Sequence, residues 1–168
     1  MINVSGTIRL RSMVEEDSDF VVDLLNKKEI QINFPRSSKI TKQSHINFIE
    51  KLKQSHEYYW IIEKDKCPVG TISIYNINYD HNRAEWGRFA IHPAYCRQGI
   101  GTSVLNAIID YSFTTLKLHR LFCYSMSENK IALKLYSKLG FNIEGVLKEH
   151  IYIDGKYVDY IILGLVKK

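Results

Sequence analysis

The sequence predicts a single α/β domain, residues 1–168, with a mixed central sheet of about seven strands flanked by about four helices. Three observations support this prediction. A chain of 168 residues, 45% of them hydrophobic, has the right size for one domain with its own core. Segments of alternating hydrophobicity are interspersed with segments of helical period. Short turns join some strands and helices connect others, so both antiparallel and parallel strand pairs are expected.

The first third of the chain predicts one strand and two helices. Residues 6–13 alternate between apolar and polar side chains, which indicates a strand. Residues 14–25 indicate a helix, because acidic residues occupy the first turn and apolar residues recur at helical spacing: Phe20, Val21, Leu24 and Leu25. The segment FPRSSKIT interrupts this pattern, and residues 42–54 predict the second helix.

The middle of the chain predicts three strands and the longest helix. Residues 58–64 and 70–77 indicate a hairpin closed by the turn DKCPVG. Residues 84–93 indicate the next strand, which ends at Pro93. Apolar residues then recur at helical spacing over residues 99–116, so this segment is expected to return across the sheet as a helix.

The last third predicts a strand, a helix and a hairpin. Residues 119–126 indicate the strand, and residues 129–140 indicate a helix with an apolar stripe of Ile131, Leu135 and Leu139. A second stripe on that helix is basic and is expected to be solvated: Lys130, Lys134 and Lys138. Residues 141–153 and 156–166 form strands around an Asp-Gly turn, which is a strong hairpin signal.

Composition excludes several classes of protein. The net charge of +5 favours anionic partners, but the basic residues are dispersed and form no nucleic-acid motif, so no nucleic acid is expected. The N-terminus lacks the apolar core of a signal peptide, and no apolar run is long enough to cross a membrane. Three cysteines without zinc spacing predict reduced thiols, no metal and a cytoplasmic location: Cys67, Cys96 and Cys123.

The segment CRQGIG, residues 96–101, predicts a diphosphate site. It lies between a strand and a helix, and the first turn of a helix carries backbone N–H groups without internal partners. Gly99 and Gly101 let a ligand approach the backbone, and Arg97 and Gln98 add donors. The segment matches neither a dinucleotide fingerprint nor a P-loop. On this turn alone, a tight strand-to-helix connection that binds nothing is an equal alternative.

A second motif adds to the argument. Residues 129–141, NKIALKLYSKLGF, resemble the pattern N-x-x-A-x-x-x-Y-x-x-x-G-F of the GNAT superfamily of acetyl-CoA-dependent N-acetyltransferases. Every fixed position is filled, by Asn129, Ala132, Tyr136, Gly140 and Phe141. The superfamily's earlier motif, [RQ]-x-x-G-x-[GA], aligns with residues 96–101, where Cys96 departs from it. The departure predicts rearranged or weakened phosphate contacts. The resemblance extends over the whole order of elements and is strongest over residues 84–141.

The resemblance implies a cofactor site and a mechanism. Acetyl-CoA would be the co-substrate, with its diphosphate on the backbone of residues 97–102: Arg97, Gln98, Gly99, Ile100, Gly101 and Thr102. The pantetheine would run beside the strand that contains Phe89, Ala90 and Ile91, and Asn129 would contact it. Tyr136 would be the general acid that protonates the departing thiolate, because the pKa of a phenol is near that of a thiol.

The acceptor amine must lose a proton before it attacks in the ternary complex. Glu85 is the first candidate for the base and His92 is the second. Each assignment has a structural alternative. Tyr136 could be a core residue bonded to a backbone carbonyl, Glu85 could be paired with Arg83 or Arg88, and Asn129 could only cap its helix.

The acceptor is the least defined part. Within GNAT the chain resembles a branch that contains ribosomal-protein-alanine, spermidine and amino-sugar-nucleotide acetyltransferases. A polyamine needs several carboxylates, and the candidates are Glu15, Glu16, Asp17, Asp19 and Asp23. The basic balance disfavours a polycationic acceptor and is compatible with a protein N-terminus or with an amino-sugar nucleotide, whose diphosphate would meet Arg36, Lys39 or Lys42. We prefer the amino-sugar nucleotide.

Two other acceptors and a non-enzyme stay open. The alternatives to the small-molecule amine of a sugar nucleotide are a protein N-terminus and a polyamine. A third reading is a non-catalytic acyl-CoA-binding module. A homodimer is expected on general grounds.

Overall fold

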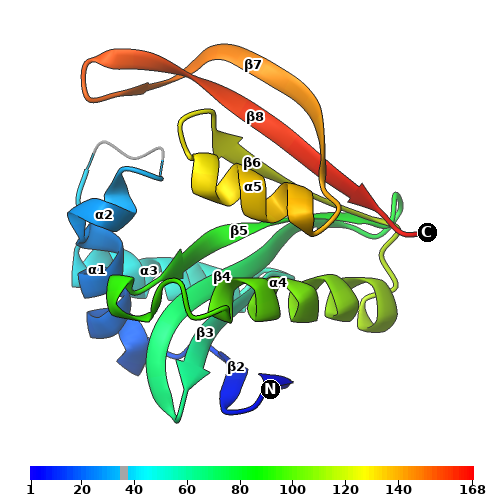
Figure 1. Ribbon diagram of the computed structural model, residues 1–168. Helices are drawn as coiled ribbons and strands as arrows, with labels where there is room; N and C mark the ends of the chain where they lie inside the picture. Colours follow the sequence, from blue (N-terminus) through cyan, green and yellow to red (C-terminus); the bar gives the residue numbers. More distant parts are fainter. Residues whose placement is uncertain (35–37) are drawn as a thin grey trace.

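The computed structural model describes residues 1–34 and 38–168 and shows an α/β domain built on one sheet (Figure 1). In the described residues the sheet has eight strands in the order β1-β2-β3-β4-β5-β6-β8-β7. Their bounds are Ile2–Ser5, Ile8–Ser12, Tyr58–Lys64, Cys67–Asn78, Arg83–Ile91, Arg120–Met126, Asn142–Ile153 and Lys156–Val166 for β1 to β8. The α/β class and the mixed sheet are confirmed. The extra strand is β1, a four-residue edge strand that pairs with β2 through a short turn.

Helices cover both faces of the sheet. They are α1 Ser18–Asn26, α2 Lys28–Gln31, α3 Lys42–Lys53, α4 Ile100–Asp110 and α5 Lys130–Lys138. One core cluster joins α4 and α5 to side chains such as Trp60, Ile62 and Trp86. A second joins α1 and α2 to the opposite face, where Ile61 and Ala90 point. Because successive strand residues alternate between faces, β3 and β5 contribute side chains to both clusters. No helix in the described part of the chain could span a membrane.

Two predicted helices differ in detail, and one predicted core residue is wrong. Residues 15–17 form a 3₁₀ turn before α1, and α4 ends in a π-helical turn over Tyr111–Thr115. Ile131 is 83% exposed, whereas Leu135 and Leu139 of the same predicted stripe pack against the core. Ile131 lies in the first turn of α5, where the core contact is made instead by Ala132 and Leu133.

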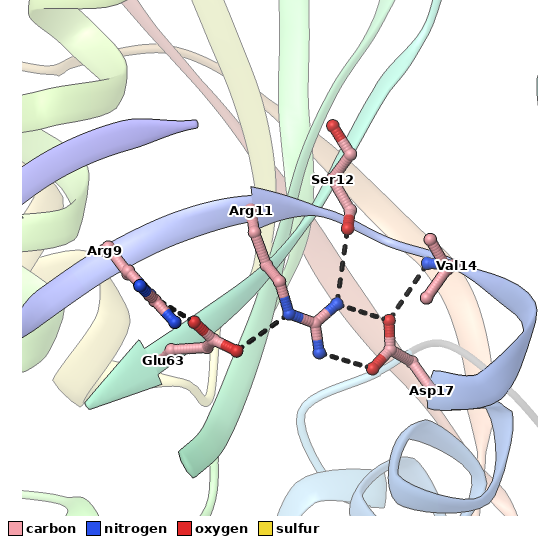
Figure 2. A network of polar contacts seen from close by, with 6 residues as sticks. All are labelled: Arg9, Arg11, Ser12, Val14, Asp17 and Glu63. Atoms are coloured by element: carbon pink, nitrogen blue, oxygen red, sulfur yellow. Dashed lines mark hydrogen bonds and ion pairs between the residues drawn. The ribbon is translucent and has the colours of Figure 1, made fainter. Parts of the chain in front are cut away.

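An ion-pair network fastens the start of α1 to the sheet (Figure 2). Arg11 donates to both oxygens of Asp17 at 2.6 Å and to Glu63 at 2.8 Å, and Arg9 also donates to Glu63. Burial opposes ionisation of both carboxyls, but the hydrogen bonds from Arg11 hold the pKa of Asp17 and Glu63 below their ordinary values. The network fixes the position of the start of α1 relative to β2 and β3.

The strands β5 and β6 pair over a short stretch and then separate. Within residues 1–34 and 38–168 they are the one parallel pair, and their register covers only Arg83–Glu85 against Arg120–Phe122. Farther along β5 the pairing with β4 slips between Thr71 and Ser73, so one extra residue enters β5. Arg88 lies in this bulge with a φ of +49°, and its carbonyl accepts a bond from Thr71 Oγ1. A β-bulge bends a strand, and the divergence of β5 from β6 leaves room for a ligand.

Candidate active site

A cavity of about 260 Å³ lies where β5 and β6 diverge. Its walls come from β4, β5, β6, β8, α5 and the segment after α2. Four of the residues predicted for the site line it together: Glu85, Phe89, Asn129 and Tyr136. They come from two elements that are distant in sequence, β5 and α5 with its N-cap, so the fold brings the predicted site residues into one place.

Tyr136 lies on α5 and is largely buried among aromatic rings. Its ring meets Trp86 edge-to-face with centroids 4.9 Å apart, and Phe141 packs on it at 6.4 Å. No hydrogen bond to its hydroxyl is found within the described ranges, so the expected alternative of a backbone-bonded core tyrosine is not supported. Burial, and then Cys123 and Tyr160, raise the pKa of the phenol. The hydroxyl is therefore neutral at physiological pH and is a weaker acid than the sequence argument assumed.

Glu85 lies on β5 with both carboxylate oxygens engaged. Oε1 accepts a 2.7 Å bond from the Tyr75 hydroxyl, and Oε2 accepts a 2.8 Å bond from Asn76 Nδ2. Tyr75 faces Glu85 across the β4–β5 pair. The alternative pairing with Arg83 or Arg88 is not formed, because Arg88 binds Glu57 and Arg83 lies over the Phe122 ring. Glu85 is thus a fixed carboxylate at the cavity wall.

Asn129 and His92 both act as caps. The Asn129 side chain accepts from the N–H of Ala132 at the start of α5, as the structural alternative proposed, and Asn129 also lines the cavity. His92 Nδ1 accepts from the N–H of Ala94 in the 3₁₀ turn Pro93–Tyr95. His92 is not among the residues that line the cavity, so Glu85 is the better placed of the two candidate bases.

The loop predicted to hold the diphosphate leads directly into α4. Gly99 is the N-cap of α4 and has a φ of +77°, a conformation that favours glycine. Arg97 is also left-handed, with a φ of +61°. The first turn of α4, from Ile100 through Thr102, has its free N–H groups at this end. The Ile100 side chain is buried in the core, so only its backbone is available to a ligand.

The Gln98 side chain is already occupied. Its amide donates to the Ala94 carbonyl and its oxygen accepts a 2.7 Å bond from Lys64 Nζ. Lys64 ends β3, and its ammonium is therefore held at the loop. No sequence pattern marks this cation, because only the fold brings residue 64 next to residue 98.

The strand proposed to hold pantetheine is β5, and its backbone is more available to a ligand than its side chains are. Ala90 points into the core cluster under α1, and Ile91 packs against the other cluster. Phe89 lines the cavity. Since the β5–β6 pairing stops at Glu85, the β6-facing edge of β5 beyond that residue has no strand partner in the described structure. Such an edge can pair with an extended ligand.

Several cavity residues were not predicted. Burial raises the pKa of the Cys123 thiol, with a further contribution from Glu85, so the thiol stays protonated. Burial and the Glu85 charge raise the pKa of Tyr160 to about 12. Tyr75 and Arg88 also line the cavity. No sequence motif marks these residues. Within the described ranges no cluster of three or more His, Cys, Asp or Glu side chains could hold a metal ion.

The splayed parallel strands, the left-handed glycine before α4 and the cavity under α5 define an α/β acyltransferase. Residues 21–141 match the model of the acetyltransferase (GNAT) family, and the chain belongs to that family. It is therefore an N-acetyltransferase, as the two motifs predicted.

The chain is similar to two kinds of curated relative. It is 30% identical to spermidine N(1)-acetyltransferase of Vibrio cholerae, over 93% of this chain and 91% of the relative. It is 31% identical to acetyltransferase PseH of Campylobacter jejuni, over 77% of this chain and 87% of the relative. The crystal structure of the Vibrio cholerae spermidine N-acetyltransferase in complex with CoA and spermine superposes with a TM-score of 0.90, at 27% identity and 96% coverage of both chains.

Proposed function

We propose that this enzyme transfers the acetyl group of acetyl-CoA directly to a primary amine in a ternary complex. Tyr136 is the general acid and Glu85 is the general base. The observation that carries the proposal is that an unbonded, neutral Tyr136 hydroxyl and the fixed Glu85 carboxylate line one cavity. A non-catalytic acyl-CoA-binding module would need neither group in that position.

In the proposed reaction Glu85 acts on the acceptor amine and Tyr136 acts on the leaving thiolate. Glu85 accepts the proton of the acceptor amine, directly or through water, and the amine nitrogen attacks the thioester carbonyl carbon. A C–N bond forms and the carbonyl oxygen takes negative charge, which backbone N–H groups of β5 can stabilise. Collapse of the intermediate breaks the C–S bond, and the Tyr136 hydroxyl protonates the thiolate. The second excess proton of the nitrogen passes to the Tyr136 phenolate, directly or through water, and restores the hydroxyl. The products are the N-acetylated amine and coenzyme A.

The coenzyme is proposed to lie along the loop and the open edge of β5. The backbone N–H groups of residues 97–102 would hold the diphosphate, with Gly99 allowing the close approach. Lys64 adds a positive charge at the same end. Phe89, Ala90 and Ile91 would pair through their backbone with the pantetheine, and Asn129 would flank it.

The acceptor is proposed to be an amino-sugar nucleotide, with a polyamine as the alternative. Three of the five acidic residues considered for a polyamine are paired: Asp17 with Arg11, Asp19 with Lys42 and Asp23 with Lys27. The other two, Glu15 and Glu16, line a different groove. The similarity to spermidine N(1)-acetyltransferase of Vibrio cholerae supports the polyamine alternative. A protein N-terminus has no support from the comparisons reported above.

The cations expected to meet a sugar nucleotide remain a prediction. Lys42 is engaged with Asp19, and Lys39 is exposed beside α3. Arg36 lies outside the described residues. Self-association and a cytoplasmic location are likewise predictions.

Calorimetric titration with acetyl-CoA tests the cofactor site first. We expect binding to the native protein and its loss in Gly99→Trp, because an indole at the N-cap of α4 would fill the space for the diphosphate. Gly155→Trp is the matched control: both glycines have a φ near +80° and no heavy atom within 4 Å of an added Cβ. Loss of binding in both variants, or no binding to the native protein, would contradict the assignment.

A second assay compares acceptors at equal concentration: an amino-sugar nucleotide, spermidine and a peptide with an alanine N-terminus. We expect acetylation of the sugar nucleotide to be the fastest. Turnover of spermidine alone would overturn this choice of acceptor, and no turnover with intact acetyl-CoA binding would favour the non-catalytic module.

A further inference from the structure

We propose that Arg88 selects acceptors that carry an oxyanion, a phosphate or a carboxylate, beside the reacting amine, and that Glu57 occupies Arg88 until such an acceptor binds. The proposal rests on the function proposed above and names a specificity-determining residue for it. It concerns the acceptor end of the cavity, away from the phosphate loop.

The bulge in β5 is what brings Arg88 to the acceptor side. Along a regular strand, residue 88 would share a face with Trp86, which is buried in the core under α4 and α5. The extra residue in β5 and the positive φ of Arg88 change this. The Arg88 guanidinium instead contacts Phe48 of α3 and Tyr75 of β4. It therefore lies on the same side of the sheet as the Tyr75–Glu85 pair.

Aromatic rings hold the guanidinium in place. It lies 4.1 Å from the centre of the Tyr75 ring and 5.0 Å from that of Phe48. Stacking against rings fixes the plane of a guanidinium and leaves its N–H edge open for hydrogen bonds. The side chain is 28% exposed and lines the cavity. A positioned guanidinium at a cavity wall is suited to bind a phosphate or carboxylate.

The Glu57 carboxylate uses part of the donor capacity of Arg88. Arg88 Nη1 donates to Glu57 Oε2 at 2.9 Å, and the described structure gives this side chain no other hydrogen bond. A guanidinium has five N–H donors, so an incoming oxyanion can join or replace Glu57. Glu57 is 23% exposed and can be hydrated when it is displaced. It thus acts as an internal competitor for the acceptor's anion.

The charges of the cavity match a zwitterionic acceptor. Among its described lining residues, Glu85 is the one carboxylate and Arg88 the one permanent cation. A protonated amine can meet Glu85 while its oxyanion meets Arg88. A polyamine would place its further ammonium groups near Arg88, and like charges at short range disfavour binding.

Matched pairs of amines test the proposal: glucosamine against glucosamine 6-phosphate for a phosphate, and β-alaninamide against β-alanine for a carboxylate. We expect kcat/KM of the native enzyme to be higher for the anionic member of at least one pair. The pair that shows the preference identifies the oxyanion. In Arg88→Gln the ratio of kcat/KM between the anionic and the neutral member should fall about 10- to 100-fold, which is the effect of losing charged hydrogen bonds. The change should appear mainly as a higher KM for the anionic member. Arg88→Lys should retain part of it.

Two further variants sharpen the test. Glu57→Gln should lower KM for the anionic member, because it removes the competitor. Arg83→Gln is the control, since Arg83 lies on the same strand over the Phe122 ring and does not line the cavity. Equal loss for both members of each pair in Arg88→Gln, or a preference for the neutral members, would overturn the proposal.

Binding without turnover separates this proposal from the proposed function. Inorganic pyrophosphate is titrated into protein saturated with coenzyme A, so that the phosphate loop is occupied. We expect binding that is lost in Arg88→Gln and kept in Arg83→Gln. If no amine is acetylated but this result holds, the proposed function fails and the anion site stands. The anion site is overturned if pyrophosphate binding is absent from the native protein or unaffected by Arg88→Gln, and neither amine pair shows a preference that depends on Arg88.

Discussion

The Tyr75 hydroxyl donates a 2.7 Å hydrogen bond to Oε1 of Glu85, and the two residues face each other on β4 and β5. Asn76 holds the other carboxylate oxygen. Asn76 has a φ of +50° and lies where the β4–β5 register slips for a second time, so this irregularity turns its amide toward Glu85. Two neighbouring side chains of one strand thus orient a carboxylate on the next strand.

Replacement of Glu85 by glutamine should lower kcat/KM about 100-fold near neutral pH, which is within the usual range for a general base. The defect should shrink as pH rises, because more of the amine is then neutral without help. The measurement is a pH profile of kcat/KM for native and variant enzyme. Asp110→Asn, on the far end of α4, should leave the profile unchanged. A pH-independent defect would contradict the assignment of Glu85 as the base.

Tyr75→Phe should reduce kcat about tenfold with little change in acetyl-CoA affinity, because one hydrogen bond that orients Glu85 is lost. Burial and the Glu85 charge raise the pKa of Tyr75, so its hydroxyl stays a donor over the working pH range. Gly87→Ala should have a similar effect, since a Cβ there would lie 2.7 Å from the Tyr75 hydroxyl and displace it. Steady-state kinetics measures kcat, and calorimetry measures the affinity for acetyl-CoA. Full activity in both variants would mean that Glu85 needs no such support.

Tyr136→Phe should lower kcat by about 10²- to 10⁴-fold while coenzyme A binds as before. The ring stays in its contact with Trp86, so only the proton donor is removed. Tyr111→Phe is a suitable control, because that ring packs on Tyr58 and Trp60 outside the cavity. Single-turnover kinetics provides the measurement. A normal rate in Tyr136→Phe would show that the thiolate leaves without this acid.

Stability should fall as pH drops below the ordinary range of histidine. His45 is buried between α1 and α3, with Nδ1 at 3.1 Å from Ser18 Oγ and Nε2 without a partner in the described structure. Burial lowers the pKa of His45, although the nearby Asp17 opposes the shift. As pH falls, the unfolded chain therefore takes up the proton before the folded protein does. The contribution of neutral His45 to stability is present above about pH 6.5 and is lost as pH falls through the lower pKa of the folded state.

Thermal unfolding between pH 7.5 and 5.5 measures this effect. His45→Phe should flatten the dependence of Tm on pH, whereas substitution of the exposed His56 by glutamine should keep it. Parallel curves for the native protein and His45→Phe would rule out His45 as the source.

The sequence was sufficient for the parts of the fold that depend on local pattern. The strands and long helices follow from hydrophobic period, and α4 begins directly after Gly99, where the sequence predicted the start of a helix. The resemblance of residues 129–141 to the GNAT motif also predicted that Asn129 and Tyr136 lie near β5, and both line the cavity beside that strand. The chemical roles of these residues are still predictions.

The parts that were missed depend on tertiary contacts. In the sequence Arg88 looks like an ordinary strand residue. The nine residues of β5 carry no clear pattern that would predict a bulge and the changed direction of this side chain. The contact of Lys64 with Gln98 joins residues 34 positions apart. Ile131 has the right spacing for the core, but the first turn of α5 does not carry it there.

The bulge at Arg88 also divides β5 into two halves that can change independently in evolution. The residues before it include Glu85, the proposed base, and those after it lead to the loop proposed for coenzyme A. A substitution at the bulge alters one side chain that already lacks a regular partner in the ladder. New acceptors can therefore be acquired there while the coenzyme half of the strand keeps its register, which offers one physical route to enzymes that share a scaffold and differ in the amine they accept.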